Sequence, residues 1–338
     1  MKRTLLAALA ALSSACWAAG GESVRAQDLS FFRIASGSAG GTYFPVAGML
    51  AQAISNPPGS TACDKGGSCG VPGLIGIAQS AQGSVANVAS INAGQIESGL
   101  VQSDVAYWAA TGSGVFERKP PLAKLRGIAS LYPEHVHVVA TAGSGVKALR
   151  DLKGKRIGVG LPASGVLVDA RIVLEAAGLN EKSGYKPAYL NSADTMAKLV
   201  DGSLDAMVTV TGYPQAAVSH LAETANARLV PIEGDVRNRI LTDNRFFSTG
   251  LIPGGTYAGI DGDTQTVAVM ALWLTSADQP EERIYRITRA LWSETTKVLL
   301  KSGHAAARSI HLETALDGMS IALHPGAARF YREAGLHP

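Results

Sequence analysis

The chain has 338 residues, of which 46% are hydrophobic and 17% are charged, and its formal net charge is +3. This composition excludes a disordered chain, and the small charge excludes the basic footprint of a nucleic-acid-binding protein. Residues 1–26 hold Lys2, Arg3 and Arg25 against Glu22, so the remainder carries only about +1. The length exceeds what one hydrophobic core usually supports, so we expect two domains.

The first 26 residues have the pattern of a secretory signal peptide. Lys2 and Arg3 precede the short apolar stretch 5–12, and Val24-Arg25-Ala26 fits a small-x-small cleavage site. The apolar stretch is too short to span a membrane, and no second long apolar segment follows. We therefore expect a soluble, exported, periplasmic protein that begins near residue 27.

Two alternatives remain for this N-terminal segment. Cleavage after Ala18 or Ala19 would also leave a small residue at the site. Cys16 raises the possibility of a lipoprotein, but Ser13-Ser14-Ala15 ahead of it is a poor match to a lipobox.

The other two cysteines, Cys63 and Cys69, predict a disulfide that closes a small loop, since the protein is expected outside the cytoplasm. A metal site is the weaker interpretation, because two cysteines lack the two further ligands that zinc requires. The same loop contains Gly66-Gly67-Ser68-Cys69-Gly70, a match to the hydrolase pattern G-x-S-x-G. That motif needs a strand before it and a helix after it, and we expect neither here.

The first predicted elements are a strand at 31–35, a Ser/Gly turn at 36–41 and a helix at 46–54. Pro45 suits the first helical turn, where a missing N–H has no consequence. Such a turn presents unpaired N–H groups and hydroxyls at the positive end of a helix, which favours a carboxylate or phosphate ligand. A glycine-rich connection without a ligand is the alternative.

Strands and helices then alternate, as in open α/β sheets. We predict further strands at 74–78, 104–110, 125–131, 135–141, 156–160, 188–190, 205–211 and within 264–274. We predict helices at 84–91, 166–177, 192–200, from Pro214 to about 221, at 281–302 and at 325–335.

The strand at 156–160, the turn at 161–165 and the helix at 166–177 repeat the opening design. Ligands of such sheets bind at helix N-termini beyond the carboxyl ends of strands. Two such turns in two α/β halves predict two lobes that face each other across a ligand cleft and close like a hinge.

Several short motifs occur in a characteristic order. They are SGSAGGTYFP at 36–45, GSVAN at 83–87, VQSDVA at 101–106, DLKGKR at 151–156, Ser164-Gly165, DGSLDA at 201–206, PGGTY at 253–257 and HPGA at 324–327. With this ordered set the chain resembles the extracytoplasmic solute receptors of the TAXI subclass of tripartite ATP-independent periplasmic (TRAP) transporters.

The resemblance implies a two-lobed periplasmic-binding-protein clamshell of type II. Lobe I would hold residues 27–140 plus 260–338, and lobe II would hold 141–259. It implies a non-enzymatic protein, expected as a monomer without cofactor or metal, that captures a small organic carboxylate. Family ligands include glutamate, glutamine and 2-oxo or dicarboxylic acids, and the partner is a permease driven by an ion gradient.

Carried onto this chain, the resemblance implies ligand-binding residues in both lobes. They are Ser38, Gly41, Thr42, Tyr43, Ser84, Asn87, Gln102, Ser164, Gly165, Val166 and Tyr213. One departure is Val166, where the family often has threonine. Valine keeps the backbone N–H but loses a hydroxyl, which would shift preference toward a less polar ligand head.

Structural roles compete with some of these assignments. Tyr43 is also compatible with a core aromatic, and Asn87 with a bond to backbone. We interpret Arg171 as a surface or ion-paired residue. His135 and His137 face one side of a strand without a third ligand, so we interpret them as structural.

Two other functions remain open. A periplasmic sensing domain would bind the same kind of ligand for a signalling partner. A serine-dependent α/β enzyme would use Ser38 or Ser164 as nucleophile and would need a histidine within hydrogen-bond reach.

Overall fold

The computed structural model describes residues 29–337. The predicted signal peptide, with its alternative cleavage and lipidation sites, lies outside the described residues. Among the helices of residues 29–337, none has the length and apolar character needed to cross a membrane.

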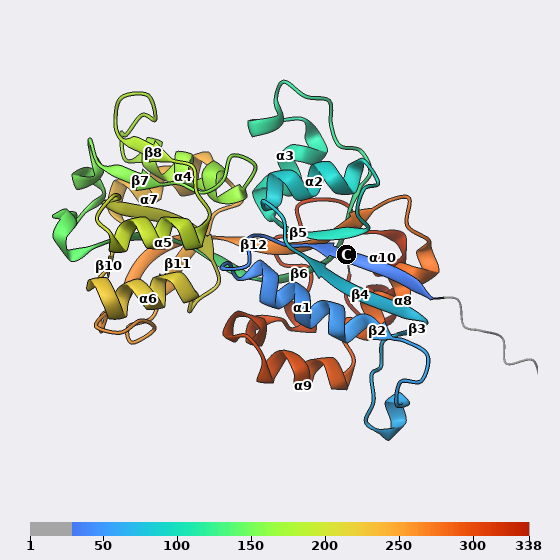
Figure 1. The fold of residues 1–338 in the computed structure, drawn as a ribbon. Helices are drawn as coiled ribbons and strands as arrows, with labels where there is room; N and C mark the ends of the chain where they lie inside the picture. The colour runs from blue at the N-terminus through green and yellow to red at the C-terminus, as the bar shows by residue number, and fades with distance from the viewer. Residues whose placement is uncertain (1–28, 338) are drawn as a thin grey trace, which may run out of the picture.

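The described chain forms two α/β bodies side by side, joined by two long strands (Figure 1). The body on the right of Figure 1, which we call lobe I, contains α1–α3, α8–α10 and β1–β5. The body on the left, lobe II, contains α4–α7 and β7–β11. The joining strands are β6 (Leu125–Ala140) and β12 (Thr264–Ser276).

Lobe I is built on parallel strands in the order β4-β1-β5. Its strands are β1 (Ser30–Ala35), β2 (Ser55–Asn56), β3 (Val71–Pro72), β4 (Leu74–Gln79) and β5 (Ser98–Gln102). Its helices are α1 (Tyr43–Ile54), α2 (Ser84–Asn92), α3 (Ser103–Thr111), α8 (Glu281–Leu291), α9 (Glu294–Ser302) and α10 (Pro325–Glu333).

Lobe II is built on the strands β9-β7-β8, also parallel. Its strands are β7 (Arg156–Gly158), β8 (Lys186–Ala188), β9 (Ala206–Thr211), β10 (Arg228–Leu229) and β11 (Ser248–Ile252). Its helices are α4 (Gly165–Ala176), α5 (Ser192–Val200), α6 (Ala216–Ala225) and α7 (Gly234–Asp243).

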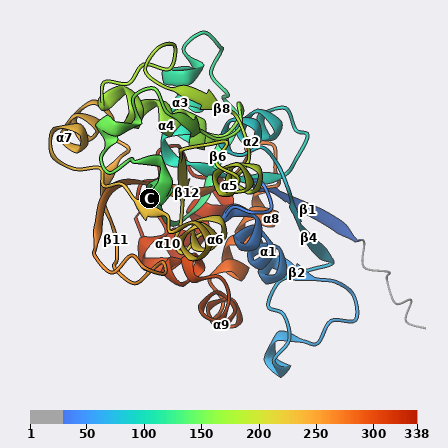
Figure 2. The same cartoon turned by 60° about the vertical axis from the view of Figure 1, so that its left-hand side comes forward.

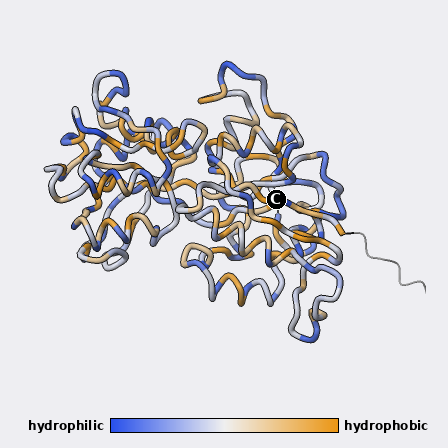
Figure 3. The backbone as a smooth tube through the Cα atoms, in the orientation of Figure 1, coloured by the Kyte–Doolittle hydropathy of each residue, from blue (hydrophilic) through white to orange (hydrophobic). Residues whose placement is uncertain are grey.

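The strands β6 and β12 belong to both lobes. They pair antiparallel with each other. The C-terminal part of β12 also pairs with β5 of lobe I, and the C-terminal part of β6 also pairs with β9 of lobe II. Each lobe has its own cluster of buried apolar residues. Figure 3 shows hydrophobic segments, in orange, in both bodies. The residue bounds expected for the two lobes remain a prediction, because these shared strands assign no single boundary.

Most predicted elements are confirmed within a few residues, with three differences. The segment at 104–110 is the helix α3 and not a strand: Asp104, Val105, Ala106 and Ala109 are buried at helical spacing. The two strands expected at 125–131 and 135–141 are one strand, β6. The single helix expected at 281–302 is divided into α8 and α9, because Ser293 caps a new helix.

Cys63 and Cys69 form the expected disulfide, with their Cα atoms 4.8 Å apart. The bond closes a small loop that extends from lobe I beyond β2 and β3, at the bottom of Figure 1. The G-x-S-x-G match lies within this loop. A 3-10 turn precedes it and the short strand β3 follows it, so the context of a hydrolase nucleophile is absent there.

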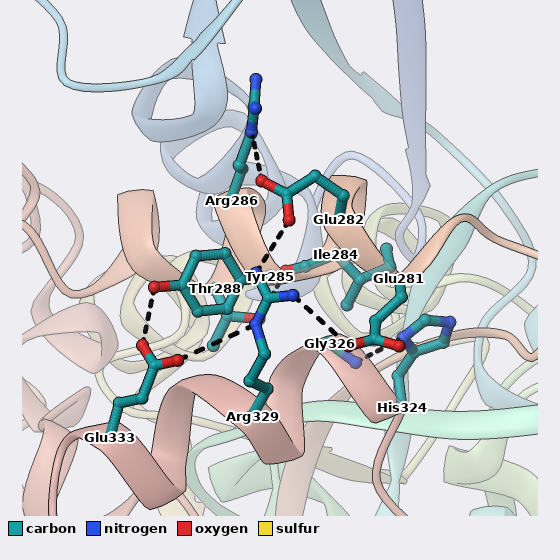
Figure 4. A network of polar contacts seen from close by, with 10 residues as sticks. All are labelled: Glu281, Glu282, Ile284, Tyr285, Arg286, Thr288, His324, Gly326, Arg329 and Glu333. Carbon is teal, nitrogen blue, oxygen red and sulfur yellow. Dashed lines mark hydrogen bonds and ion pairs between the residues drawn. The ribbon is translucent and has the colours of Figure 1, made fainter.

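The C-terminal helix α10 is held against α8 by a polar network (Figure 4). Arg329 contacts Glu281 and Glu282 of α8 at 3.4 and 2.8 Å, and its guanidinium lies 3.6 Å from the ring centre of Tyr285. The hydroxyl of Tyr285 donates to Glu333 at 2.7 Å. The buried side chain of Tyr331 anchors the opposite face of α10 by donating to the carbonyl of Ile128 in β6.

Candidate ligand-binding cleft

A cleft lies between the lobes, and helix N-termini from both of them line it. Its space, open mouth included, is about 670 Å³. The lining includes the N-cap residue of every helix from α1 to α6: Thr42, Gly83, Gln102, Ser164, Asn191 and Gln215. Figure 2, turned by 60° from the view of Figure 1, shows α5 and α6 of lobe II near α1 of lobe I.

This convergence has an electrostatic consequence. The first N–H groups of each helix have no acceptor within the helix, and the helix dipole places partial positive charge there. The cleft is therefore suited to an anionic group. Its lining within residues 29–337 includes no lysine, arginine or histidine, so helix N-termini and hydroxyls are the groups that would hold an anion.

Nine of the eleven residues proposed from the sequence line this cleft. They are Ser38, Gly41, Thr42, Tyr43, Ser84, Gln102, Ser164, Gly165 and Val166. Their contact with a ligand remains a prediction, since the structure holds none.

The other two proposed residues lie elsewhere. Asn87 is buried and donates to the carbonyls of Ser36 and Leu100 at 2.8 Å each, so it ties α2 to the neighbouring strands. Tyr213 lines a separate cavity beside the crossing strands, with its ring centre 4.8 Å from that of His135. Ligand contact of Asn87 and Tyr213 remains a prediction.

Hydrogen bonds connect the two lobes across the cleft. The hydroxyls of Thr42 and Thr211 are 2.6 Å apart, Ala86 N–H donates to the carbonyl of Ala163 at 3.0 Å, and Gln102 Nε2 donates to Asp169 Oδ2 at 2.7 Å. The structure is therefore the closed arrangement of the two lobes.

Glycines allow this close approach at two positions. A Cβ at Gly165 would overlap the side-chain oxygen of Gln102 from the opposite lobe and would crowd Ser84. Gly83 has a φ of +117°, which favours glycine, and a Cβ there would lie 3.3 Å from Ser164.

Glu134 is the carboxyl group that lines the cleft directly. It is 2% exposed, and the hydroxyl of Tyr43 donates to its Oε2 at 2.7 Å. Burial raises the pKa of Glu134 to about 8, against the lowering effect of the Tyr43 hydrogen bond and with a further increase from the nearby Asp104. Near neutral pH the empty site therefore holds a proton on Glu134.

A pair of buried aspartates lies behind the cleft wall. Asp104 of α3 and Asp169 of α4 are fully buried neighbours. Burial raises the pKa of both groups, and the charge of Asp104 raises that of Asp169 further. We infer that this pair retains a proton at neutral pH, which allows two carboxyl groups to lie together without a cation.

Arg171 and His137 have structural partners. Arg171 forms an exposed ion pair with Glu181 at 2.9 Å, as interpreted from the sequence. His137 Nδ1 donates to the carbonyl of His135 at 2.9 Å, and its Nε2 lies 3.0 Å from the hydroxyl of Tyr257. Burial lowers the pKa of His137 to about 4, so it is neutral and structural.

Sequence reasoning missed several residues of the lining. They include Gln82, Glu134, Asn191, Ser192, Thr209, Thr211 and Gln215. The clearest available signal was Glu134, the one acidic residue of strand β6. Thr209 and Thr211 could have been found as alternating polar residues on β9, two positions apart on one face.

The fold and cleft define a class: a two-lobed α/β protein with the architecture of periplasmic solute-binding proteins. The chain belongs to the NMT1-like family, whose model matches residues 34–335.

Two solved structures support the fold, and a third similar structure has a lower TM-score. A protein of Bordetella bronchiseptica RB50 is 15% identical, with 91% of this chain and 90% of that chain covered and a TM-score of 0.52. A structure described as a periplasmic transporter is 12% identical, with 90% and 92% covered and a TM-score of 0.50. The alkanesulfonate-binding protein SsuA from Xanthomonas axonopodis pv. citri, bound to MOPS, is 16% identical, with 92% and 81% covered and a TM-score of 0.48.

Proposed function

We propose that this protein is an extracytoplasmic solute-binding receptor that captures a small organic carboxylate by hinge closure. It then delivers the ligand unchanged to a membrane permease of the TRAP type, driven by an ion gradient. The TAXI-type motifs SGSAGGTYFP, GSVAN and VQSDVA support the TRAP assignment, and the NMT1-like family and the two-lobed fold are compatible with it.

The observation that carries the binding function is the convergence of six helix N-termini from two lobes on one cleft. A carboxylate can accept hydrogen bonds from their free N–H groups without a basic side chain. Val166 offers a backbone N–H at the start of α4 without the hydroxyl that threonine would add.

The cleft lining offers less support for the serine-enzyme alternative. A nucleophilic Ser38 or Ser164 needs an adjacent base, and the lining drawn from residues 29–337 includes no histidine. The hydroxyl of Ser164 is instead the cap of α4: it accepts from Leu167 N–H at 3.2 Å.

A thermal-shift screen of residues 27–338 tests the binding function. We expect small carboxylates to raise the melting temperature, because a ligand that binds only the folded state stabilises it. Neutral sugars of similar size are the matched control. A shift with sugars alone, or conversion of the ligand on incubation, would contradict the proposal.

Uptake into membrane vesicles tests the transport assignment. Vesicles that contain a TRAP permease should accumulate the radiolabelled ligand only when the receptor and an ion gradient are both present. Uptake that depends on ATP instead of the gradient would assign the receptor to a different transporter class.

A further inference from the structure

We propose that Glu134 and Tyr43 form a subsite for the protonated amine of the ligand. The ligand class is then a zwitterion, such as an α-amino acid, in preference to a 2-oxo or dicarboxylic acid. This inference rests on the proposed function, and it names which carboxylates the receptor selects.

The first observation is that one carboxyl oxygen of Glu134, Oε1, accepts no hydrogen bond from the described residues. Glu134 projects from β6 in the region where this strand passes between the lobes, and it lines the cleft while remaining 2% exposed. Tyr43 donates to Oε2, and no hydrogen bond from residues 29–337 reaches Oε1. Because Glu134 lines the cleft, Oε1 is available to accept a hydrogen bond from a donor on the ligand.

The second observation is the separation of charge within the cleft. Partial positive charge comes from the starts of α1 to α6, whereas the directly lining acid is Glu134. A ligand with a carboxylate and an ammonium group can satisfy both kinds of site at once. A dicarboxylate offers no cation to Glu134, and its second negative charge in the same small cleft would oppose ionisation of Glu134.

The titratable groups around Glu134 determine how ligand binding at this site responds to pH. Those that influence it are Tyr43 on α1, Tyr132 on its own strand, Asp104 on α3 and Asp169 on α4. None of these four supplies a positive charge. An ammonium ligand would therefore be the cation that stabilises the ionised form of Glu134, and its binding would release a proton near neutral pH.

This proton release predicts how ligand affinity changes with pH. Affinity for an amino acid should rise about tenfold per pH unit below pH 7 and level off above pH 8, where Glu134 is ionised before the ligand binds. If a protonated Glu134 instead donated to a ligand oxygen, affinity would fall above pH 8.

Calorimetry with matched ligands tests the proposal on the exported protein, residues 27–338. Glutamate, 2-oxoglutarate and glutarate have the same carbon skeleton and differ in the amine, and glutamine replaces the distal carboxylate. We expect glutamate or glutamine to bind at least tenfold more tightly than 2-oxoglutarate and glutarate. Titrations at pH 7 in two buffers with different ionisation heats should show release of close to one proton.

Glu134→Gln supplies the second arm, because glutamine keeps the shape and loses the charge. Its affinity for the amino acid should fall at least tenfold and lose its pH dependence, with little loss for glutarate. Glu181→Gln, which changes an exposed acid paired with Arg171 in lobe II, is the control and should bind as the unmodified protein does.

Each result decides between the alternatives. Tighter binding of 2-oxoglutarate or glutarate than of the amino acids, or proton uptake on binding, would overturn the amine subsite and leave the receptor function intact. Unchanged amino-acid affinity in Glu134→Gln would do the same. Failure of every carboxylate to bind would overturn the receptor function and the subsite together.

Discussion

Single residues in the cleft have structural properties that bear on the proposed binding. Glu134 has the shape of glutamine but carries one titratable proton. Because Glu134 is buried, this proton affects how the stability of the folded protein depends on pH. In the unfolded chain its carboxyl ionises near its ordinary pKa of 4.5, whereas in the folded protein it ionises at about 8.

We predict that Glu134→Gln changes how stability depends on pH. Between pH 4.5 and 8 the folded protein holds a proton on Glu134 that the unfolded chain has lost, so stability falls as pH rises through this window. Glutamine removes this term, which is at most about 5 kcal/mol. The variant should therefore gain melting temperature relative to the parent at pH 8 and show little gain at pH 4.5.

Melting curves of both proteins without ligand, recorded from pH 4.5 to 9, provide the measurement. Glu181→Gln is again the control and should follow the parent curve. A constant difference between Glu134→Gln and the parent across this range would contradict a raised pKa at Glu134.

For single residues, the sequence identifies candidate residues better than it identifies their roles. Asn87 was a reasonable candidate for ligand contact because asparagine is a poor helix former, but its amide satisfies two buried carbonyls. Those acceptors, on Ser36 and Leu100, come from other elements and are brought together only by folding. The same limit hid Glu134, whose partner Tyr43 lies 91 positions away along the chain.

At the scale of elements, local sequence patterns predict most of the helices and strands. The Ser/Gly turns before α1 and α4 have strong signals in glycine, proline and serine, and both helices begin close to the expected positions. The failure was α3, because its sequence DVAYWAA is apolar enough for a buried strand. Its alanines favour a helix, and packing of one face decides between the two.

We predict that Gly165→Ala weakens ligand binding without unfolding the protein. Gly165 is the first residue of α4, where alanine is compatible with the helix, but the added methyl would overlap Gln102 across the cleft. Closure is therefore disfavoured, and affinity should fall at least tenfold. Calorimetric titration of the variant with the ligand found by the thermal-shift screen measures this.

Gly48→Ala is the matched control for that experiment. Gly48 lies within α1, and an added Cβ there meets no atom within 4 Å. Alanine should stabilise the helix by about 0.5–1 kcal/mol and leave affinity unchanged. Equal affinity in both variants would contradict the tight contact at Gly165.

A third prediction concerns the contact between α8 and α10. Arg329→Ala removes both ion pairs to α8 and the contact with Tyr285 seen in Figure 4, so the melting temperature should fall by a few degrees at low salt. The loss should shrink at high salt, because ion pairs at the surface are screened. Lys297→Ala, which removes one exposed pair with Glu294, should have almost no effect.

At the scale of the molecule, the arrangement depends on pairings that no local pattern contains. The sequence predicts two lobes and a cleft, but it predicts two strands, at 125–131 and 135–141, where the structure has the single strand β6. This strand pairs first with β12 and then with β9, so it serves both lobes. Pairings between residues that are 66 or more positions apart in the chain determine this outcome.

The crossing strands and the few direct bonds between the lobes suggest how the molecule moves. The bonds from Thr42 to Thr211 and from Gln102 to Asp169 close the cleft, and each contributes only about 1 kcal/mol net. We therefore expect the free protein to open in solution, with the ligand supplying the additional free energy that favours the closed form.

Ser164→Trp tests this motion. Ser164 lies at the start of α4 beside Gly83 of the opposite lobe and is 6% exposed, so an indole there would hold the lobes apart. Ligand should reduce the radius of gyration of the parent protein in small-angle X-ray scattering and should leave that of the variant unchanged. Lys186→Trp adds the same ring on exposed β8 and should close normally. Normal compaction of Ser164→Trp by ligand would contradict closure at this contact, provided that its melting temperature shows a folded protein.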